Sequence, residues 1–394
     1  MPVELAARVS RVKPSPTVAL TGRVARLKAE GRDIVGLGVG EPDFDTPAHI
    51  AEAGIAAIRD GFTRYTAVEG IPELKDAIIG KFKRDNDITY TRPQILVSTG
   101  AKQTIYNLFM AVIDPGDEVV IPAPYWVSYP DMALLAEGVP VMPYAGPEQG
   151  YKITPEQLDR AITPRTRVFM LNSPSNPTGA AYTRAELEAL GAVLAKHPRV
   201  IVATDDMYEH IYWAPEPFCS FLTACPHLYD RTVTINGVSK SYAMTGWRIG
   251  YCGGPVEIVT AMSTIQSQST SNPVSISQKA ATAAIAGDQS CIGEMLRHFK
   301  ARHDLFNAGL NALPGFKVLP AAGTFYAWCD IADAMHKLGQ VDDHAFAEFL
   351  LEQAGVAGVP GSGFGAPGHI RFSFAVSMQT LEKALDRIGK ALRG

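Results

Sequence analysis

Residues 168–205 read VFMLNSPSNPTGAAYTRAELEALGAVLAKHPRVIVATD, and this stretch decides the fold. Two short apolar runs, at residues 168–171 and 200–204, lie on either side of a polar turn and of a helical pattern over residues 184–196. Parallel strands need a crossover of a dozen or more residues between them, and a helix usually provides it. The stretch therefore predicts two parallel strands with a helix packed on one face of their sheet.

The same alternation continues on both sides of this stretch. Residues 101–113 and 256–266 show helical patterns, and further strand candidates are the apolar runs at 95–98, 118–121, 139–143, 232–235 and 249–252. Near-continuous apolar strands of this kind are typical of a sheet that helices cover on both faces. We therefore expect an α/β fold with a mostly parallel, seven-stranded sheet.

The pattern changes near residue 290, where a long helical stretch over residues 289–313 begins. It is followed by strand candidates at 325–330, 356–359 and 369–373 and by helical patterns at 342–353 and 380–392. Such a mixture favours a smaller α+β layer. We expect a large domain over residues 46–290, a small C-terminal domain over residues 291–394, and an N-terminal segment, residues 1–45, that packs on the small domain.

Composition and charge exclude several classes of protein. The 394 residues carry a formal net charge of −4, so no basic field attracts nucleic acid. No run of about 18 apolar residues predicts a membrane span, and the first residues lack the apolar core of a signal peptide. The five cysteines form no CxxC pair, which indicates inert thiols in a reducing cytoplasm. We expect a cytoplasmic protein without a metal site that binds neither nucleic acid nor membranes.

Polar residues follow four of the predicted strands, at the edge where open α/β sheets bind their ligands. Lys240 comes just after the strand at 232–235, and Arg248 follows eight residues later. A partly desolvated lysine near a second cation has a lowered pKa and can form an imine, and arginine is a bidentate phosphate ligand. Pyridoxal 5'-phosphate (PLP) needs both groups, so we predict that Lys240 carries PLP as a Schiff base.

Three more residues fit the same cofactor. PLP works as an electron sink when its pyridine nitrogen stays protonated, and we predict that the carboxylate of Asp205 holds that proton. Tyr208 lies three residues further on, and we predict that it donates a hydrogen bond to the 3'-oxygen of the ring and tunes the imine. Asn176, in a turn held by two prolines, is predicted to reach the same oxygen.

The remaining candidates concern the phosphate and the substrate. The segment Gly100-Ala101-Lys102 opens a helix, and N–H groups at a helix start bind phosphate. Trp126 follows another strand and is predicted to stack on the flat pyridine ring. Arg371 lies among β-branched and aromatic neighbours, where a charge needs a partner. We predict that it clamps the α-carboxylate of an amino acid.

Four segments together resemble the class I aminotransferases of PLP fold type I, and most closely the bacterial aspartate aminotransferases, including those that also transaminate prephenate. They are GLGVGEPDFDTP at residues 36–47, PYW at 124–126, NPTG at 176–179, and SKSYAMTGWR at 239–248. The resemblance extends from about residue 13 to the C-terminal helix. It implies that PLP is the cofactor, bound by a large domain beside a smaller one.

The resemblance also implies roles that the residues alone do not indicate. Tyr65 matches a tyrosine that reaches the phosphate of the neighbouring subunit, which implies a homodimer with shared active sites. Lys13 matches a lysine that takes part in prephenate binding. Asp206 stands where the family often has glutamate, and no arginine is identified for a distal carboxylate. The residues expected to contact the substrate are Gly40, Trp126, Asn176, Arg371 and Lys13.

The predicted reaction is ping-pong transamination between an amino acid, aspartate by resemblance, and 2-oxoglutarate, with Lys240 as the proton carrier. Prephenate, aromatic amino acids and alanine stay open as substrates, because small pocket changes shift specificity by only about 1–3 kcal/mol. A C–S lyase or an aminocyclopropane-carboxylate synthase on the same fold is an alternative, and so is a transcription regulator with an aminotransferase-like domain. A dinucleotide dehydrogenase is disfavoured because the glycines at 36–40 do not follow the GxGxxG spacing.

Overall fold

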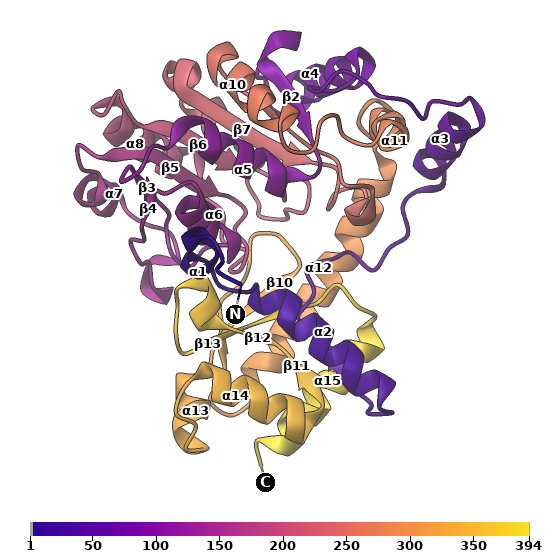
Figure 1. The fold of residues 1–394 in the computed structure, drawn as a ribbon. Helices are drawn as coiled ribbons and strands as arrows, with labels where there is room; N and C mark the ends of the chain where they lie inside the picture. The colour runs from indigo at the N-terminus through magenta and orange to yellow at the C-terminus, as the bar shows by residue number, and fades with distance from the viewer. Residues whose placement is uncertain (1–2, 394) are drawn as a thin grey trace.

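A seven-stranded sheet forms the centre of the larger part of the molecule in this computed structural model, which describes residues 3–393 (Figure 1). Its strand order is β2-β8-β7-β6-β5-β3-β4, and β8 runs antiparallel to both of its neighbours. The bounds are β2 (Ile95–Ser98), β3 (Glu118–Val120), β4 (Val139–Val141), β5 (Thr166–Asn172), β6 (Ile201–Asp205), β7 (Thr232–Gly237) and β8 (Gly250–Gly253). The prediction of a mostly parallel, seven-stranded sheet is confirmed.

Helices cover both faces of this sheet, because its strands bury side chains on both sides. In β5, Val168 and Met170 pack into one apolar cluster, whereas Phe169 and Leu171 pack into another. This two-residue period places one cluster on each face of the sheet. The helices of this larger part are α3 (Ala48–Arg59), which packs on α11, and α4 (Pro72–Asn86), α5 (Ala101–Val112), α6 (Ser128–Leu135), α7 (Pro155–Ala161), α8 (Arg184–Ala195), α9 (Phe221–Ala224), α10 (Val256–Ser267) and α11 (Ser275–Ala286).

A smaller antiparallel sheet, of order β12-β13-β10-β9, lies in the other part of the molecule (Figure 1). Its strands are β9 (Lys317–Val318), β10 (Tyr326–Asp330), β12 (Val359–Pro360) and β13 (His369–Ser373). The helices around it are α12 (Ser290–Asn311), α13 (Ala332–Lys337), α14 (Asp343–Phe349) and α15 (Met378–Ala391). The long helix α12 extends from beside α11 into this smaller part.

The strand predicted at residues 356–359 is in fact two strands, so that prediction was wrong in detail. β11 (Val356–Ala357) pairs in parallel with β1 (Val35–Gly36), whereas β12 joins the small sheet. Gly358 separates the two, and a β-carbon there would lie 2.5 Å from the ring of Phe372. The chain therefore needs a glycine where it passes from one sheet to the next.

The described part of the N-terminal segment touches both parts of the molecule. Helix α1 (Ala7–Arg11) contacts α6, and Arg11 forms an ion pair with Glu137 at 2.9 Å. Helix α2 (Pro16–Ala29) lies beside the smaller part, where Arg23 pairs with Glu348. None of the described helices is both long and apolar enough to cross a membrane.

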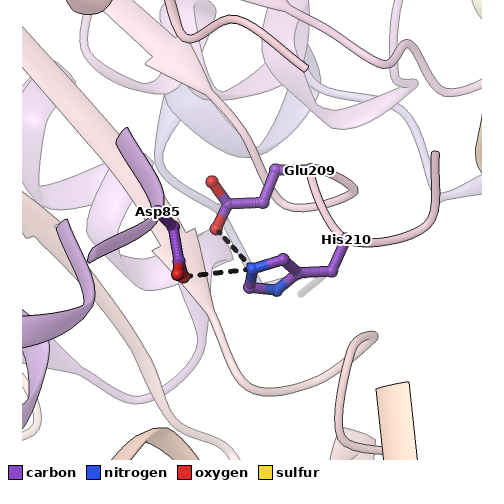
Figure 2. A group of neighbouring side chains, drawn as sticks. All are labelled: Asp85, Glu209 and His210. Atoms are coloured by element: carbon purple, nitrogen blue, oxygen red, sulfur yellow. Dashed lines mark hydrogen bonds and ion pairs between the residues drawn. The ribbon is translucent and has the colours of Figure 1, made fainter. Parts of the chain in front are cut away.

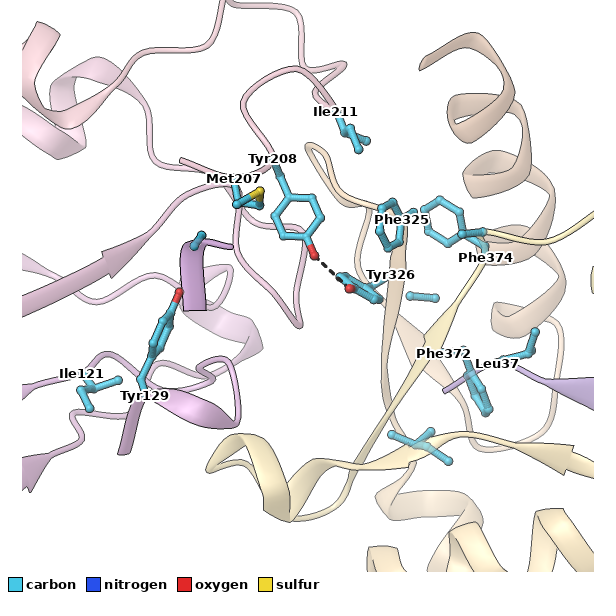
Figure 3. Close-up of a cluster of buried hydrophobic side chains, with 14 of the residues drawn as sticks. Leu37, Ile121, Tyr129, Met207, Tyr208, Ile211, Phe325, Tyr326, Phe372 and Phe374 are labelled. Atoms are coloured by element: carbon cyan, nitrogen blue, oxygen red, sulfur yellow. Dashed lines mark hydrogen bonds between the residues drawn. The ribbon is translucent and has the colours of Figure 1, made fainter. Parts of the chain in front are cut away.

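Aromatic side chains fill the space between the two sheets. Figure 3 shows Tyr208 at the end of the large sheet facing Phe325 and Tyr326 of the smaller part. The ring centroids of Tyr208 and Phe325 are 5.6 Å apart and their planes are nearly perpendicular, at 78°. This edge-to-face packing joins the two parts at the carboxyl ends of the parallel strands, where the site lies.

Candidate active site

A cavity of about 340 Å³ opens at the carboxyl ends of β5, β6 and β7, between the two parts of the molecule. It brings together most of the residues singled out from the sequence, although they come from segments far apart in the chain. Those lining it are Gly40, Ala101, Lys102, Trp126, Asn176, Asp205, Tyr208, Lys240, Arg248 and Arg371. Gly100, Tyr65 and Lys13 are not among the lining residues, although Gly100 directly precedes the lining Ala101.

Lys240 follows β7, which aims the segment after it into the cavity. Its Nζ donates a hydrogen bond of 2.6 Å to the carbonyl oxygen of Gly40. Burial lowers the pKa of Lys240 to about 8; the Glu41 carboxylate opposes this shift, and the cations of Arg248 and Arg371 add to it. A substantial fraction of the amine is therefore neutral near pH 8, which is the form that attacks a carbonyl carbon.

Asp205 ends β6 and is held by three neighbours. Its carboxylate accepts hydrogen bonds from the hydroxyl of Tyr129 at 2.6 Å and from the backbone N–H of Met207 at 3.2 Å. The Asn172 side chain donates to the backbone carbonyl of Asp205 at 2.8 Å. Burial raises the pKa of Asp205, and the bonds from Tyr129 and Met207 oppose that rise. The carboxylate is thus fixed with one side toward the cavity.

Sequence reasoning did not find Tyr129. It lies in α6, and its buried ring packs into the main apolar cluster, as an ordinary core aromatic does. Its partner Asp205 is 76 positions away in the chain. Only the packing of α6 against the sheet reveals the contact, and no local signal in the sequence points to it.

A cradle for a phosphate forms where β2 turns into α5. Gly100 has φ +82° and ψ 154°, a conformation that only glycine adopts readily. A β-carbon at Gly100 would lie 2.1 Å from Nη2 of Arg248, and one at Gly250 would lie 2.1 Å from the backbone nitrogen of Ala101. The backbone of Gly100 is therefore so close to the guanidinium of Arg248 that no side chain would fit between them. N–H groups in the first turn of a helix and an arginine together suit a dianion.

Arg248 and Lys102 complete the cradle. Arg248 has φ +54°, rare for a residue with a side chain, and its Nη1 donates to the carbonyl of Thr245 at 2.8 Å. Lys102 places its Nζ 4.9 Å from the centre of the Trp126 ring. Desolvation and the nearby Arg248 lower the pKa of Lys102. Such mutual repulsion between cations is relieved when an anion binds.

Arg371 is 2% exposed and lies across the cavity on β13. Its Nη1 donates to the side-chain oxygen of Asn176 at 2.7 Å, and its Nη2 donates to the carbonyl of Gly38 at 2.8 Å. Both acceptors are neutral, and Nε is left without a partner. The guanidinium is packed between the rings of Tyr326, at 4.3 Å, and Phe364, at 4.9 Å. A buried cation held in this way is ready for a carboxylate.

Ion pairs and hydrogen bonds hold the segment that follows Asp205 in place. Figure 2 shows three of the side chains involved, Asp85, Glu209 and His210. Glu209 is buried and forms an ion pair with Lys81. It also accepts hydrogen bonds from the amides of Asn86, at 2.9 Å, and Asn236, at 2.8 Å. Asp85, Glu209 and His210 are residue types that also bind metal ions, and their side chains lie close together. Here the ammonium of Lys81 pairs with Glu209 in the place that a cation would take.

Two predicted residues lie elsewhere. Tyr65 is 91% exposed on the surface. Lys13 is exposed, and its backbone nitrogen lies 3.4 Å from a carboxylate oxygen of Asp131. Ser15 and Thr17, which lie two and four residues after Lys13, do line the cavity and were not singled out from the sequence.

Comparisons with known proteins agree with this geometry. The family model "Aminotransferase class I and II" matches residues 32–388. The aspartate/prephenate aminotransferase of Nitrosomonas europaea is 56% identical over 99% of this chain and 100% of its own length. The crystal structure of the aspartate aminotransferase from Rhizobium meliloti superposes with a TM-score of 0.95 at 46% identity, covering 100% of this chain and 99% of that one.

A second solved structure, the Thermus thermophilus aspartate aminotransferase with maleate, has a TM-score of 0.93 at 42% identity and covers 99% of this chain and 100% of that one. The family match spans most of the chain, and the relatives match it over their whole length. The chain therefore belongs to the class I and II aminotransferases, which depend on PLP, as its sequence predicted.

Proposed function

We propose that this aminotransferase transfers the amino group of aspartate to 2-oxoglutarate and also accepts prephenate. The observation that carries the proposal is the buried Arg371, whose partners are all neutral, on the same cavity as Lys240. An amino acid and a 2-oxo acid both present a carboxylate to such a clamp. The relative from N. europaea is named for aspartate and prephenate, and the T. thermophilus structure contains maleate, a dicarboxylate.

The cavity residues fit PLP, which supplies the electron sink that transamination needs. The cradle at Gly100-Ala101-Lys102 and Arg248 would hold the phosphate, and Asp205 would keep the proton on the ring nitrogen. Tyr208 and Asn176 would donate to the 3'-oxygen. The contact between Gly100 and Arg248 leaves no room for a side chain, which supports a backbone-and-arginine site for a dianion.

The residues of the chain divide the remaining work. Arg371 orients the substrate by its α-carboxylate, and the backbone of Gly40 closes over it. Lys240 Nζ would take the proton from the substrate Cα and deliver it to the C4' carbon of the bound cofactor, and the second half-reaction would reverse this transfer. Its pKa near 8 suits both roles, because a general acid–base group works best close to the working pH.

The same proposal gives roles to Trp126 and Lys13, one toward the cofactor ring and one toward the substrate. Trp126 lines the cavity beside Lys102 and would stack on the cofactor ring. Lys13 lies just before the cavity-lining Ser15 and Thr17, so a small movement of this segment would bring its ammonium to a distal carboxylate or to prephenate. No other residue of the described chain is proposed for that carboxylate.

We further propose a cytoplasmic homodimer in which Tyr65 of each subunit reaches the phosphate site of its partner. The 91% exposure of Tyr65 supports this role, because its side chain is free to reach into a second subunit. We divide each subunit into a large domain over residues 46–290, a small domain over residues 291–394 and an N-terminal segment over residues 1–45.

A panel of amino donors with 2-oxoglutarate tests the activity. The protein loaded with PLP should show its highest kcat/KM with aspartate, and it should form an amino acid from prephenate when aspartate is the donor. Lys240→Ala should lose transamination while the protein stays folded. Release of pyruvate and ammonia from cystathionine without an amino acceptor would indicate a lyase instead, and absence of transfer from aspartate would refute the proposal.

A further inference from the structure

The hydroxyl of Tyr326 lies where the cofactor side and the substrate side of the cavity meet. Tyr326 begins β10 and is 1% exposed. Its Oη is 2.9 Å from the Oη of Tyr208, as Figure 3 shows, and the two rings are 5.9 Å apart at 75°. Its ring also lies 4.3 Å from the guanidinium carbon of Arg371. One side chain therefore contacts both the residue proposed for the 3'-oxygen and the residue proposed for the α-carboxylate.

The two hydroxyls share a single hydrogen bond, so if one hydroxyl donates its proton to this bond, the other must accept it. If Tyr208 donates its proton to the cofactor, it must accept the proton of Tyr326. Chained hydrogen bonds polarise one another, and a phenol that accepts one bond becomes a stronger donor in the next. Tyr326 thus strengthens the donation of Tyr208 toward the 3'-oxygen.

The surroundings leave the Tyr326 hydroxyl little freedom to turn away. A β-carbon at Gly40 would lie 2.2 Å from this hydroxyl, so the backbone of Gly40 borders it directly. The charged and titratable groups that act on the tyrosine pair or on Lys240 come from four elements: Arg371 on β13, Asp205 at the end of β6, Glu41 after β1, and Arg248 before β8. All of them stay unchanged when only the Tyr326 hydroxyl is removed.

We infer that Tyr326 is a positioning residue that fixes Tyr208 as the donor to the cofactor's 3'-oxygen and so sets the pH range in which Lys240 Nζ keeps its proton. This inference rests on the proposed function. A donated hydrogen bond draws electron density from the 3'-oxygen and weakens its hold on a proton shared with Lys240. Loss of the Tyr326 hydroxyl should therefore let Lys240 keep the proton to a higher pH.

The test is a pH titration of the visible absorbance of the PLP-loaded protein, a readout that does not depend on turnover. Tyr326→Phe should raise the midpoint by roughly 0.2–0.4 pH unit, as expected when a cooperative part of a charge-assisted hydrogen bond is lost. Tyr208→Phe should raise it further. Tyr326→Phe added to Tyr208→Phe should cause no additional shift, since Tyr326 acts through Tyr208.

Three controls separate positioning from packing. Tyr182→Phe removes another buried hydroxyl, one that accepts from the Ile153 N–H at 2.9 Å away from this cavity, and should leave the midpoint unchanged. Tyr326→Phe keeps the ring against Arg371 and should bind maleate within about twofold of the unmodified protein. Tyr326→Leu removes the ring and should weaken maleate binding by roughly threefold to thirtyfold.

The outcomes also distinguish this inference from the proposed function. An unchanged midpoint in Tyr326→Phe, or an equal shift in the presence and absence of the Tyr208 hydroxyl, would overturn the inference alone. A loaded, unmodified protein without a pH-dependent visible band would overturn both. Thermal unfolding midpoints of all variants show whether each one is folded before it is titrated.

Discussion

Gly100 offers the sharpest test of the phosphate cradle, because a single methyl group should damage it in two separable ways. At φ +82° and ψ 154°, an alanine at this position would be strained. The new β-carbon would also lie 2.1 Å from Nη2 of Arg248, far inside contact distance. The substitution Gly100→Ala must therefore push the Arg248 guanidinium out of the position it needs to bind phosphate.

The two effects have different magnitudes and appear in different measurements. Backbone strain of this kind costs about 1–3 kcal/mol and lowers the stability of the cofactor-free protein. Loss of a hydrogen bond from a charged donor costs about 1.5–3 kcal/mol. If that bond is the one from Arg248 to the phosphate, PLP should bind roughly tenfold to hundredfold more weakly.

Two other glycines provide matched controls. Gly116 has φ +88°, and a β-carbon added to it would meet no atom within 4 Å, so Gly116→Ala carries strain without the clash. Gly246 lies two residues before Arg248, again in open space and without a positive φ, so Gly246→Ala carries neither. Thermal unfolding of the cofactor-free variants measures strain, and titration with PLP followed by absorbance measures binding.

Only Gly100→Ala should lose affinity for PLP, whereas Gly100→Ala and Gly116→Ala should both lose stability. The reasoning is refuted if Gly100→Ala binds PLP as tightly as the unmodified protein. It is refuted equally if Gly116→Ala, which leaves Arg248 untouched, weakens binding to the same degree.

Three further predictions concern groups around the site. Glu209→Ala removes the closest anionic partner of the buried Lys81 ammonium, which keeps only Asp85 at 3.9 Å and the amide oxygen of Asn86 at 2.8 Å. It should lower the free energy of unfolding by about 3–5 kcal/mol, measured with urea. Tyr129→Phe removes a donor that holds down the pKa of Asp205, so the acidic limb of the kcat profile should move to higher pH. Burial, with Glu209 nearby, raises the pKa of Asp206 from 3.8 to about 7, so the folded protein keeps a proton that the unfolded chain releases. The free energy of unfolding should therefore fall from about pH 4 to 7, and Asp206→Asn should remove up to about 4 kcal/mol of that fall in urea titrations at both pH values.

Each of these has an outcome that contradicts it. Glu348→Ala, which removes an exposed partner of Arg23, should cost less than about 1 kcal/mol, so an equal loss in Glu209→Ala would show that burial is unimportant. An unmoved acidic limb in Tyr129→Phe would mean that Asp205 does not titrate there. A parallel decline of stability in Asp206→Asn and the unmodified protein would assign the decline to another group.

The large sheet could be predicted from the sequence because its strands are buried on both faces. All four residues of β2 and all five of β6 are buried, so each strand is a short apolar run that stands out between polar turns. The strands of the small part of the molecule were harder to predict from the sequence. β11 and β12 are two residues each, and nothing in a run of apolar residues shows that Gly358 divides it between two sheets.

The candidate site was predictable where chemistry directly follows a strand. Lys240, Asp205 and Asn176 could be found in this way, and all three line the cavity. Tyr129 and Tyr326 could not be found, since neither directly follows a strand of the large sheet and a buried tyrosine is most often an ordinary core residue. Their hydroxyl contacts arise from helix and strand packing across long stretches of chain, which local patterns do not encode.

The charge network at Glu209 has a consequence for the order in which the chain folds during synthesis. Glu209 is bonded to Asn86, 123 positions before it, and to Asn236, 27 positions after it. In a nascent chain that has not yet reached Glu209, the Lys81 ammonium has only partners from α4 itself, Asp85 at 3.9 Å and Asn86 at 2.8 Å. Burial of Lys81 against the sheet is therefore less favourable until Glu209 is present. We therefore expect the segment that carries Asp205 and Tyr208 to fold together with α4 and β7, to which Glu209 is bonded. The floor of the cavity is thus held by contacts within the protein that need no cofactor.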